Sequence, residues 1–231
     1  MKLQFLIESK PSRVVPQVRS ERGCFVGMAI ATFDLIETMR FEALDGFIDL
    51  DSHLERMKAS ADELGFGFNR HDCRNDLQAA TFRLSENARV RLVLSPSGAL
   101  AIEVRAMPAP PVEPVAVGLA PLPFAPDDLR LRHKTSDRAQ FQLAHEIAGK
   151  FEVVFVGEDG FVTEGSFTNV FVERGGVLLT PPRGSLMPGI LRGRLIAQGE
   201  AIEADLTPDD LVDGFFIGNS LRGLIAAQLI V

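Results

Sequence analysis

The chain of 231 residues contains neither tyrosine nor tryptophan, and it has only two cysteines, Cys24 and Cys73. The missing tyrosine removes the phenol from the catalytic acids and ring-hydroxyl partners that a site could use. The two cysteines have no paired spacing and no metal-type cluster. We therefore expect reduced thiols, no metal site and a reducing, cytoplasmic compartment.

Long apolar runs and an excess of basic residues are also missing. No apolar run reaches the roughly 18 residues that a bilayer-spanning helix needs, and the first fifteen residues mix charged side chains with short apolar runs, unlike a signal peptide. The formal net charge of −7 argues against a broad nucleic-acid surface. We expect neither a membrane nor a nucleic-acid partner, and local arginines must meet any anionic ligand.

The composition is that of a globular protein, with 46% apolar and 24% charged residues and enough length for a sizeable core. The segment from Pro108 to Pro114 holds four prolines in seven residues, which favours an extended connector. It predicts a smaller α+β domain over 1–107, a linker over 108–114 and a larger domain over 115–231.

Hydrophobic periodicity and turn residues predict an α/β arrangement of short strands and helices. Before the linker we expect strands over 31–41, 47–50, 89–94 and 99–104, a helix from the N-cap Asp51 to the stop at Gly65, and a helix within 72–83. After the linker we expect strands over 115–119, 129–133, 151–156, 161–163, 169–173, 177–179 and 214–217, helices over 137–148 and 190–198, and a last apolar segment.

Lys134 and Glu164 are the pair that carries a chemical hypothesis. Lys134 lies between an expected strand and a helix, where its side chain can reach a cleft, and Glu164 lies at a strand end. An amine that forms a Schiff base and a carboxylate that keeps a heterocyclic nitrogen protonated are what a pyridoxal phosphate enzyme requires. Taken alone, each residue is by default a solvated surface charge, so the surrounding residues must decide.

Three segments could hold a phosphate. Pro188 and Gly189 precede a helix start, where free backbone amides and the helix dipole favour an anion. Asn219 and Ser220 follow a strand, and Arg56 offers a forked guanidinium. Any helix start has such amides, and Arg56 could equally be a solvated helix residue.

Six collinear stretches together resemble the class IV aminotransferase family, the fold group of branched-chain and D-amino acid aminotransferases, and most closely its 4-amino-4-deoxychorismate lyase branch. The stretches are LIETMR (35–40), HLERM (53–57), HKTSDR (133–138), EGSFTN (164–169), LMPGILR (186–192) and GNSLRG (218–223). They cover nearly the whole chain in the family's order, which makes the set far more specific than any one of them.

The resemblance implies a D-amino acid aminotransferase-like fold of two domains, with pyridoxal 5'-phosphate at the domain interface, and a homodimer. It implies that Lys134 is the Schiff-base lysine and that Glu164 is the partner of the pyridine nitrogen. The phosphate would then be held by Arg56, the amides of Ile190 and Leu191, and Asn219 with Ser220.

Departures from the family pattern bear on the reaction. Many aminotransferases of this group have a tyrosine shortly after the lysine, whereas residues 139–141 here are Ala, Gln and Phe. Lyase relatives often carry a threonine in the first stretch. Thr38 matches it and could pass a proton, although Glu37 leaves the register open and Thr38 could be an ordinary strand threonine.

The leading hypothesis is cleavage of 4-amino-4-deoxychorismate, a small anionic substrate, to 4-aminobenzoate and pyruvate. Its two carboxylates call for arginines, and the candidates are Arg40, Arg91, Arg138 and Arg222, of which the last two lie inside matching stretches. An amino acid aminotransferase would share the lysine, glutamate and phosphate cup. A non-catalytic relative would be indicated by loss of Lys134 or Glu164, and both are present.

Overall fold

The computed structural model describes residues 33–125, 127–182 and 187–230; Cys24, Leu186 and the first residues of the strand expected over 31–41 lie outside them. The first half contains β1 (Leu35–Glu42), β2 (Gly46–Phe47), α1 (Leu50–Leu64), α2 (Arg70–Thr81), β3 (Ala88–Leu94) and β4 (Leu100–Ala106). The second half contains β5 (Val115–Pro121), α3 (Leu129–Arg132), α4 (Ala139–Ala148), β6 (Glu152–Val156), β7 (Val162–Gly165), β8 (Asn169–Arg174), β9 (Val177–Thr180), α5 (Ile190–Ala197), β10 (Ala201–Glu203), a 3₁₀ helix (Pro208–Leu211), β11 (Phe215–Asn219) and β12 (Gly223–Leu229).

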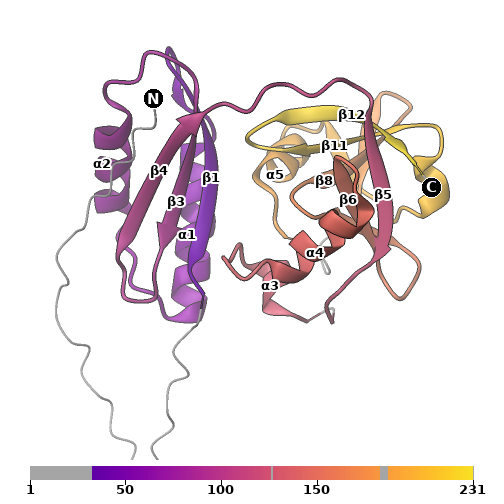
Figure 1. The fold of residues 1–231 in the computed structure, drawn as a ribbon, viewed down its shortest axis with the longest axis horizontal. Helices are drawn as coiled ribbons and strands as arrows, with labels where there is room; N and C mark the ends of the chain where they lie inside the picture. The colour runs from indigo at the N-terminus through magenta and orange to yellow at the C-terminus, as the bar shows by residue number, and fades with distance from the viewer. Residues whose placement is uncertain (1–32, 126, 183–186, 231) are drawn as a thin grey trace, which may run out of the picture.

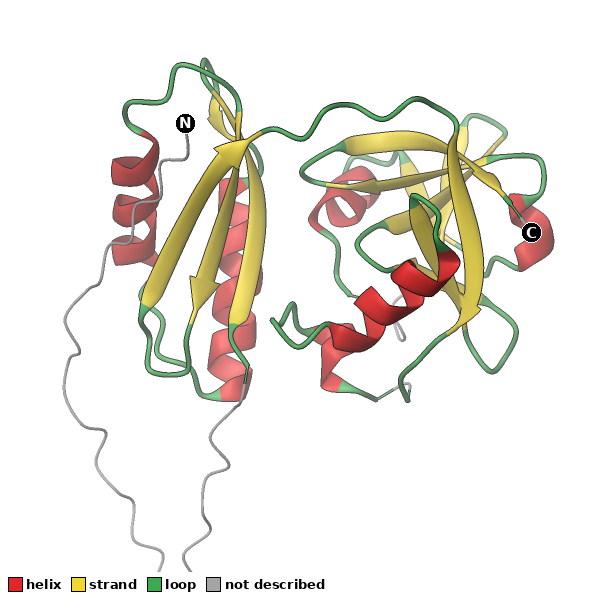
Figure 2. Ribbon diagram, in the orientation of Figure 1, coloured by secondary structure: helices red, strands yellow, loops and turns green. Residues whose placement is uncertain are grey.

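Two β-sheets organise these elements. One has four strands in the order β2-β1-β3-β4, and the other has eight in the order β10-β9-β8-β11-β12-β5-β6-β7. Figures 1 and 2 show them side by side, joined by the loop from β4 to β5. Residues 108–114 therefore connect strands of different sheets, but the division into domains 1–107 and 115–231 stays a prediction.

The four-stranded sheet has one face packed on helices and one face turned toward the other sheet. Every second residue of β1 and β3, among them Met39 and Val90, is buried with Leu54 and Met57 of α1, as the two-residue period of a strand predicts. The opposite face of this sheet is turned toward the eight-stranded sheet (Figure 1), and the alternate residues of β1 and β3 lie on that face. Any polar residue in that second set is therefore placed toward the space between the sheets.

The eight-stranded sheet curls around an apolar core that includes Val117, Val154 and Ile217. β5 pairs in parallel with β6, and α4 lies in the crossover between them. The first four residues of β6 are all buried, which explains why its sequence is a continuous apolar run apart from Glu152.

The segment that carries Lys134 is held against β1. The amide of Ile36 donates to the carbonyl of Lys134 at 2.8 Å, and the amide of Ser136 donates to the carbonyl of Asp34 at 2.8 Å. A β-bridge joins Leu35 to Thr135 between these bonds. The backbone of Lys134 is thereby fixed at the junction of the two sheets.

Most expected elements are confirmed, with three corrections. The strand expected over 47–50 is shorter: β2 is Gly46–Phe47, the amide of Ile48 still donates to the carbonyl of Arg40 at 2.9 Å, and the chain then turns into α1. Asp51 is not the N-cap: Asp49 takes that place with a left-handed φ of 54°, and the Asp51 carboxylate instead binds Arg70 at 2.8 Å. Residues 129–132 are not a strand but the helix α3, capped by the side chain of Asp128 on the amide of Arg130 at 2.8 Å.

Within the described residues, no helix has both the length and the apolar character that crossing a bilayer would require.

Candidate active site

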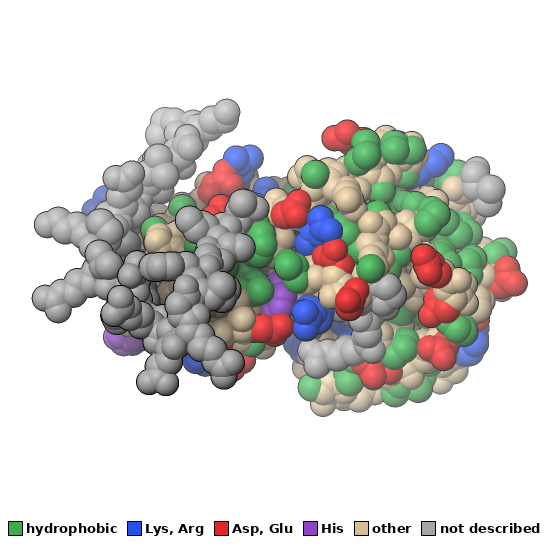
Figure 3. All heavy atoms as spheres, turned by 90° about the horizontal axis from the view of Figure 1, so that it is seen from below, with side chains coloured by type: hydrophobic (Ala, Val, Ile, Leu, Met, Phe, Trp, Pro, Cys, Tyr) green, Lys and Arg blue, Asp and Glu red, His purple; other side chains and the backbone are tan. Residues whose placement is uncertain are grey.

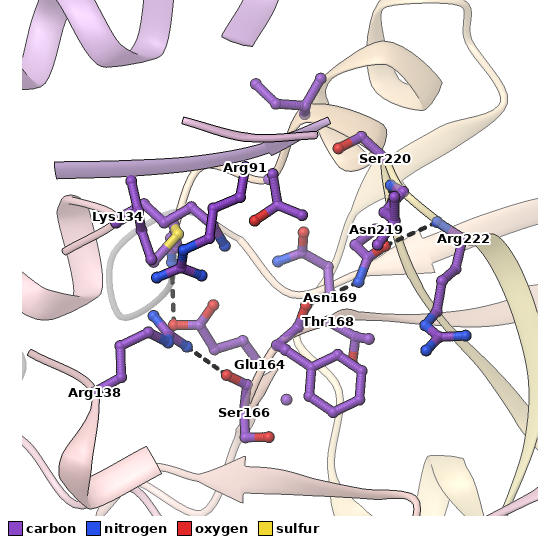
Figure 4. A pocket seen from close by; sticks show the side chains of 18 of the residues that line it. Arg91, Lys134, Arg138, Glu164, Ser166, Thr168, Asn169, Asn219, Ser220 and Arg222 are labelled. Atoms are coloured by element: carbon purple, nitrogen blue, oxygen red, sulfur yellow. Dashed lines mark hydrogen bonds between the residues drawn. The ribbon is translucent and has the colours of Figure 1, made fainter. Parts of the chain in front are cut away.

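A cavity of about 310 Å³ lies between the two sheets, within the size range of small-ligand sites. Its charged lining residues among those described are Arg56, Arg89, Arg91, Lys134, Arg138 and Arg222, with the single carboxylate Glu164. Figure 4 shows side chains from both halves of the chain converging on this space. By contrast, acidic and basic side chains are interspersed on the face of the molecule that Figure 3 shows. The cavity is therefore locally cationic in an acidic protein, which fits an anionic ligand.

Lys134 extends its amine into this cavity (Figure 4). Burial of the amine and the nearby cations Arg138 and Arg56 lower the pKa of Lys134 to about 7, while Glu37 and Glu164 oppose the shift. An amine with this pKa is in part unprotonated at neutral pH. It can therefore act both as a nucleophile and as a proton acceptor.

Glu164 is the next-to-last residue of β7 and is 5% exposed. Its Oε1 accepts a hydrogen bond from the amide of Met187 at 3.2 Å. Burial raises the pKa of Glu164 to about 8, against the opposing effects of the Met187 amide, Arg138 and Lys134. A cationic group brought beside this carboxylate would favour its ionised form.

Arg56 reaches the cavity from α1 and is held on both sides. Its Nε and Nη2 donate to the two oxygens of Glu37 at 2.8 and 2.6 Å, and its Nη1 donates to the carbonyl of Pro188 at 2.9 Å. Burial alone would raise the pKa of Glu37, but Arg56 and His53 outweigh it and lower this pKa to about 2. Arg56 is thus a fixed cation beside the start of α5.

The same geometry places Glu37 and Thr38 on opposite faces of β1. Glu37 is 1% exposed and points to α1, where it also binds His53 Nδ1 at 2.7 Å. Thr38 and Ile36 are on the opposite face of β1 and line the cavity. Thr38 is therefore the residue of this pair that a ligand would meet.

The start of α5 and the turn between β11 and β12 form one wall. Gly189 is the N-cap of α5, and it lines the cavity with Ile190, whereas Leu191 does not line it and packs in a core cluster. Asn219 and Ser220 also line the cavity. Because the first amides of a helix have no partner within the helix, this wall offers donors to an anion.

Three of the four arginines expected at the mouth, Arg91, Arg138 and Arg222, line the cavity. Arg40 does not: it lies farther along β1 and pairs with Glu42 at 2.7 Å. Arg89, which the sequence did not single out, takes its place in the lining. The signal for it was the alternation of Arg89 and Arg91 with the buried Val90, which puts both arginines on one face of β3.

The class IV aminotransferase family (Amino-transferase class IV) matches residues 34–230 of this chain. The chain belongs to this family. A Schizosaccharomyces pombe protein provisionally named an aminodeoxychorismate lyase is 30% identical over 195 residues, which are 79% of this chain and 84% of that protein. A Thermotoga maritima protein provisionally named a branched-chain-amino-acid aminotransferase is 30% identical over 158 residues, 65% of this chain and 58% of that protein.

Among class IV structures, a crystal structure from Mesorhizobium loti provisionally named an amino-acid aminotransferase has a TM-score of 0.79 and 36% identity. The match covers 86% of this chain and 100% of the Mesorhizobium loti chain. The mixed α/β fold expected from the sequence is therefore confirmed as the class IV fold. Its relatives carry the names of two reactions, so the family membership by itself leaves the reaction open.

Class IV enzymes depend on pyridoxal phosphate, and this cavity fits that cofactor. It presents an amine of lowered pKa, a buried carboxylate, and a fixed guanidinium beside a helix start. The lack of a side chain at Gly189 leaves room for the side chain of Asn169 at the start of α5, because a Cβ on Gly189 would lie 1.7 Å from Oδ1 of Asn169. Asn169 itself lines the cavity and is 5% exposed.

Several residues of the cavity lining have no role in the sequence-based prediction. Ser166, Thr168 and Asn169 belong to a quoted stretch but were given no role, although all three line the cavity. In the sequence Glu37 only leaves the register of the first stretch open, whereas in the structure it is the partner of Arg56. The spacing of Glu37 and Arg56 carried no signal for this pairing, since a strand and a helix in contact have no fixed sequence offset.

Proposed function

We propose that this protein is a pyridoxal phosphate-dependent lyase that converts 4-amino-4-deoxychorismate to 4-aminobenzoate and pyruvate, a step towards folate. The excess of guanidinium groups around Lys134 and Glu164 carries the proposal. The substrate has two carboxylates, whereas a branched-chain amino acid has one carboxylate and an apolar side chain. The name of the Schizosaccharomyces pombe relative supports the same reaction.

We assign the cofactor contacts as follows. The amine of Lys134 holds the cofactor, and the carboxylate of Glu164 pairs with its ring nitrogen. We assign the phosphate to Arg56, to the first amides of α5, and to Asn219 with Ser220. These amides are those of Ile190 and of Leu191, and Leu191 would contribute its backbone alone because its side chain packs in the core. When bound, pyridoxal phosphate supplies an electron sink, and Glu164 maintains it by favouring the protonated ring.

Lys134 and Thr38 are the residues to which we assign proton handling. The pKa of Lys134, about 7, suits an amine that takes a ring proton from the substrate at neutral pH. Loss of that proton and cleavage of the bond between the ring and the enolpyruvyl oxygen make the ring aromatic. The group leaves as the enol of pyruvate, which becomes pyruvate when its carbon takes up a proton. Thr38 lines the same cavity, where its hydroxyl can pass a proton to the leaving group.

The substrate carboxylates would be bound by the arginines that line the cavity. Arg138 is held by the carbonyl of Ser166 and stacks on Phe141 at 4.4 Å, so its guanidinium is ordered before a ligand arrives. The guanidinium of Arg91 has no hydrogen-bond or ion-pair partner within 33–125, 127–182 and 187–230. Burial and the nearby Arg89 lower the pKa of Arg91, against the opposing effect of Glu103. A guanidinium without a partner gains more interaction energy from a substrate carboxylate than one that is already paired.

An amino acid aminotransferase is the second candidate. It is supported by the 36% identity to the Mesorhizobium loti structure and by the match to the Thermotoga maritima protein. In that reaction Lys134 would move a proton between the substrate carbon and the cofactor, and a keto acid acceptor would be required.

The deciding experiment supplies purified, cofactor-loaded protein with 4-amino-4-deoxychorismate and no keto acid. The lyase predicts equal amounts of 4-aminobenzoate and pyruvate, followed by fluorescence and by a coupled pyruvate assay. Lys134→Ala should abolish both products, whereas Lys150→Ala, which alters a lysine outside the cavity lining, should not. Product formation that depends strictly on an added keto acid would refute the lyase and establish the aminotransferase.

We also propose a cytoplasmic homodimer, as the class IV resemblance and the cysteine usage imply. Light scattering on the eluting peak of a sizing column would give twice the chain mass of 25.2 kDa. A mass of one chain at micromolar concentration would contradict the dimer.

A further inference from the structure

Glu152 is a buried carboxylate that has no part in the proposed reaction. It begins β6 and is 0% exposed. Its Oε1 accepts hydrogen bonds from the amides of Val153 and Ser166 and from the Ser166 hydroxyl, at 2.8, 2.9 and 2.5 Å. Its Oε2 accepts from the Phe167 amide at 3.1 Å and from the Thr168 hydroxyl at 2.8 Å. The carboxylate therefore gathers donors from the turn after Glu164.

No ion pair to Glu152 is found in the described part of the chain, and the hydrogen bonds to its carboxylate all come from neutral donors. Arg138 interacts with it electrostatically without forming an ion pair. Burial raises the pKa of Glu152, and the hydrogen bonds from Ser166 and Thr168 oppose that rise. A buried carboxylate without a paired cation is costly to keep. A leucine in a buried strand would avoid that cost, so a role in shaping the turn is needed to explain the residue.

The role follows from the geometry of one peptide unit. The N–H of Phe167 and the C=O of Ser166 belong to the same trans peptide, in which they point in opposite directions. Because the N–H is directed to Glu152, the carbonyl is directed away from it. That carbonyl accepts the hydrogen bond from Nη2 of Arg138, as Figure 4 shows.

The turn has no room for a different arrangement. A Cβ on Gly165 would lie 2.5 Å from Oγ1 of Thr168 and 2.7 Å from Oε2 of Glu152. The next carbonyl along the turn, that of Phe167, accepts a hydrogen bond from Nδ2 of Asn219 at 3.1 Å. Glu152 thus lies on the inner side of a turn whose outer carbonyls hold two residues of the cavity.

Arg138 in turn acts on both members of the central pair. After burial it is the largest influence that lowers the pKa of Lys134, and it also lowers the pKa of Glu164. The position of the Arg138 guanidinium therefore affects the protonation of both groups. It is set by the Ser166 carbonyl on one side and by the ring of Phe141 on the other.

We propose that Glu152 is a positioning residue of the active site: it fixes the Ser166–Phe167 peptide, and that peptide holds Arg138 beside Glu164 and Lys134. The proposal rests on the proposed cofactor site and holds equally for a lyase and an aminotransferase. Glu152 acts through Arg138 and touches neither cofactor nor substrate.

The test is a pH titration of the visible absorption of the pyridoxal phosphate-loaded protein, in the parent and in Glu152→Gln. Glutamine offers one acceptor oxygen instead of two, so it cannot hold both sets of donors. Arg138 then loses its carbonyl partner and moves from the lysine–cofactor linkage. Since a nearby cation lowers the pKa of that linkage, the titration midpoint should rise by about 0.5 to 1 pH unit.

The sign of the shift separates this role from its rivals. If Glu152 acted directly by its own negative charge, its removal would lower the midpoint. If it only stabilised the fold, the urea midpoint would fall and the absorption midpoint would stay unchanged. Either result overturns the proposal. The matched control is Glu158→Gln, which alters an exposed carboxylate of the next turn and should leave both midpoints unchanged.

A double-mutant cycle tests the route through Arg138. In an Arg138→Ala background, Glu152→Gln should add no further shift, and an additive shift overturns the proposal. If Glu152→Gln does not fold, Thr168→Val removes one donor from the same carboxylate and should give a smaller shift of the same sign. A parent protein without a titratable band refutes the cofactor site and this proposal together, whereas an unshifted Glu152→Gln refutes this proposal alone.

Discussion

The ion pair of Glu37 with Arg56 offers the most direct test of the site's electrostatics. Glu37 is buried on β1, with Arg56 on both of its oxygens and His53 on one of them. Replacement by glutamine keeps the size of the side chain and removes its charge. Arg56, whose side chain is 11% exposed, is then left without its anionic partner.

The magnitude follows from the lowered pKa. A pKa of Glu37 that falls from 4.5 to about 2 on folding corresponds to about 3 kcal/mol, at about 1.4 kcal/mol per pH unit. Because the pKa is lower in the folded state, this stability is present above pH 4.5 and is lost as the pH falls towards 2. We expect Glu37→Gln to cost about 3 kcal/mol at pH 7 and about 1.5 kcal/mol at pH 3.

Urea unfolding at pH 7 and pH 3 measures both values. The control is Glu55→Gln, also on α1, whose side chain is 66% exposed and pairs with Arg70; an exposed pair contributes at most about 1 kcal/mol. A cost of Glu37→Gln below 1 kcal/mol at pH 7, or an equal cost at both pH values, would refute the reasoning.

Three further predictions follow from the geometry. Gly189→Ala should weaken pyridoxal phosphate binding at least about tenfold, because its Cβ would overlap Asn169, whereas Gly193→Ala in the same helix has no atom within 4 Å of the new Cβ and should bind normally; equilibrium dialysis measures both, and equal affinities would contradict the steric argument. Arg91→Ala should raise the KM for the substrate about tenfold or more, the value of a charged hydrogen bond, and Arg40→Ala should change it little, since Arg40 is outside the cavity; steady-state kinetics that show the reverse order would exchange their roles. Asp128→Ala should cost about 1 kcal/mol in thermal or urea unfolding through the lost cap of α3, and no loss would mean that the cap is replaced by water.

The sequence predicted regular elements well where one period dominated. β1 and β3 alternate over seven or eight residues, and α1 and α4 repeat at helical spacing for ten residues or more. Residues 129–132 show why short stretches fail. Leu-Arg-Leu-Arg alternates like a strand, but four residues make only one helical turn, and the side chain of Asp128 caps it. Over so few residues the cap determines the structure and the period does not.

The sequence allowed most residues of the candidate site to be predicted, but not the contacts between them. Lys134, Glu164, Arg56 and Asn219 belong to recognisable stretches, and all of them line the cavity. Glu152 could not be found in this way. It lies in the apolar run of β6, and its donors Ser166 and Thr168 come from a turn 14 to 16 residues later. A buried polar residue in an apolar strand signals that partners exist, but only the fold shows which they are.

The contacts also explain why the six stretches occur together. The first and second are one unit, because Glu37 binds His53 and Arg56. The third and fourth are joined by Arg138 on the carbonyl of Ser166. The fifth and sixth pack so closely that a Cβ on Gly218 would lie 2.8 Å from Cδ2 of Leu191. Two hydrogen bonds link the three pairs to one another. Arg56 of the second stretch donates to the carbonyl of Pro188 in the fifth, and Asn219 of the sixth donates to the carbonyl of Phe167 in the fourth. A substitution in one stretch should therefore be compensated most readily by a change in a stretch that it contacts, even where more than a hundred residues separate the two, as they do for Arg56 and Pro188.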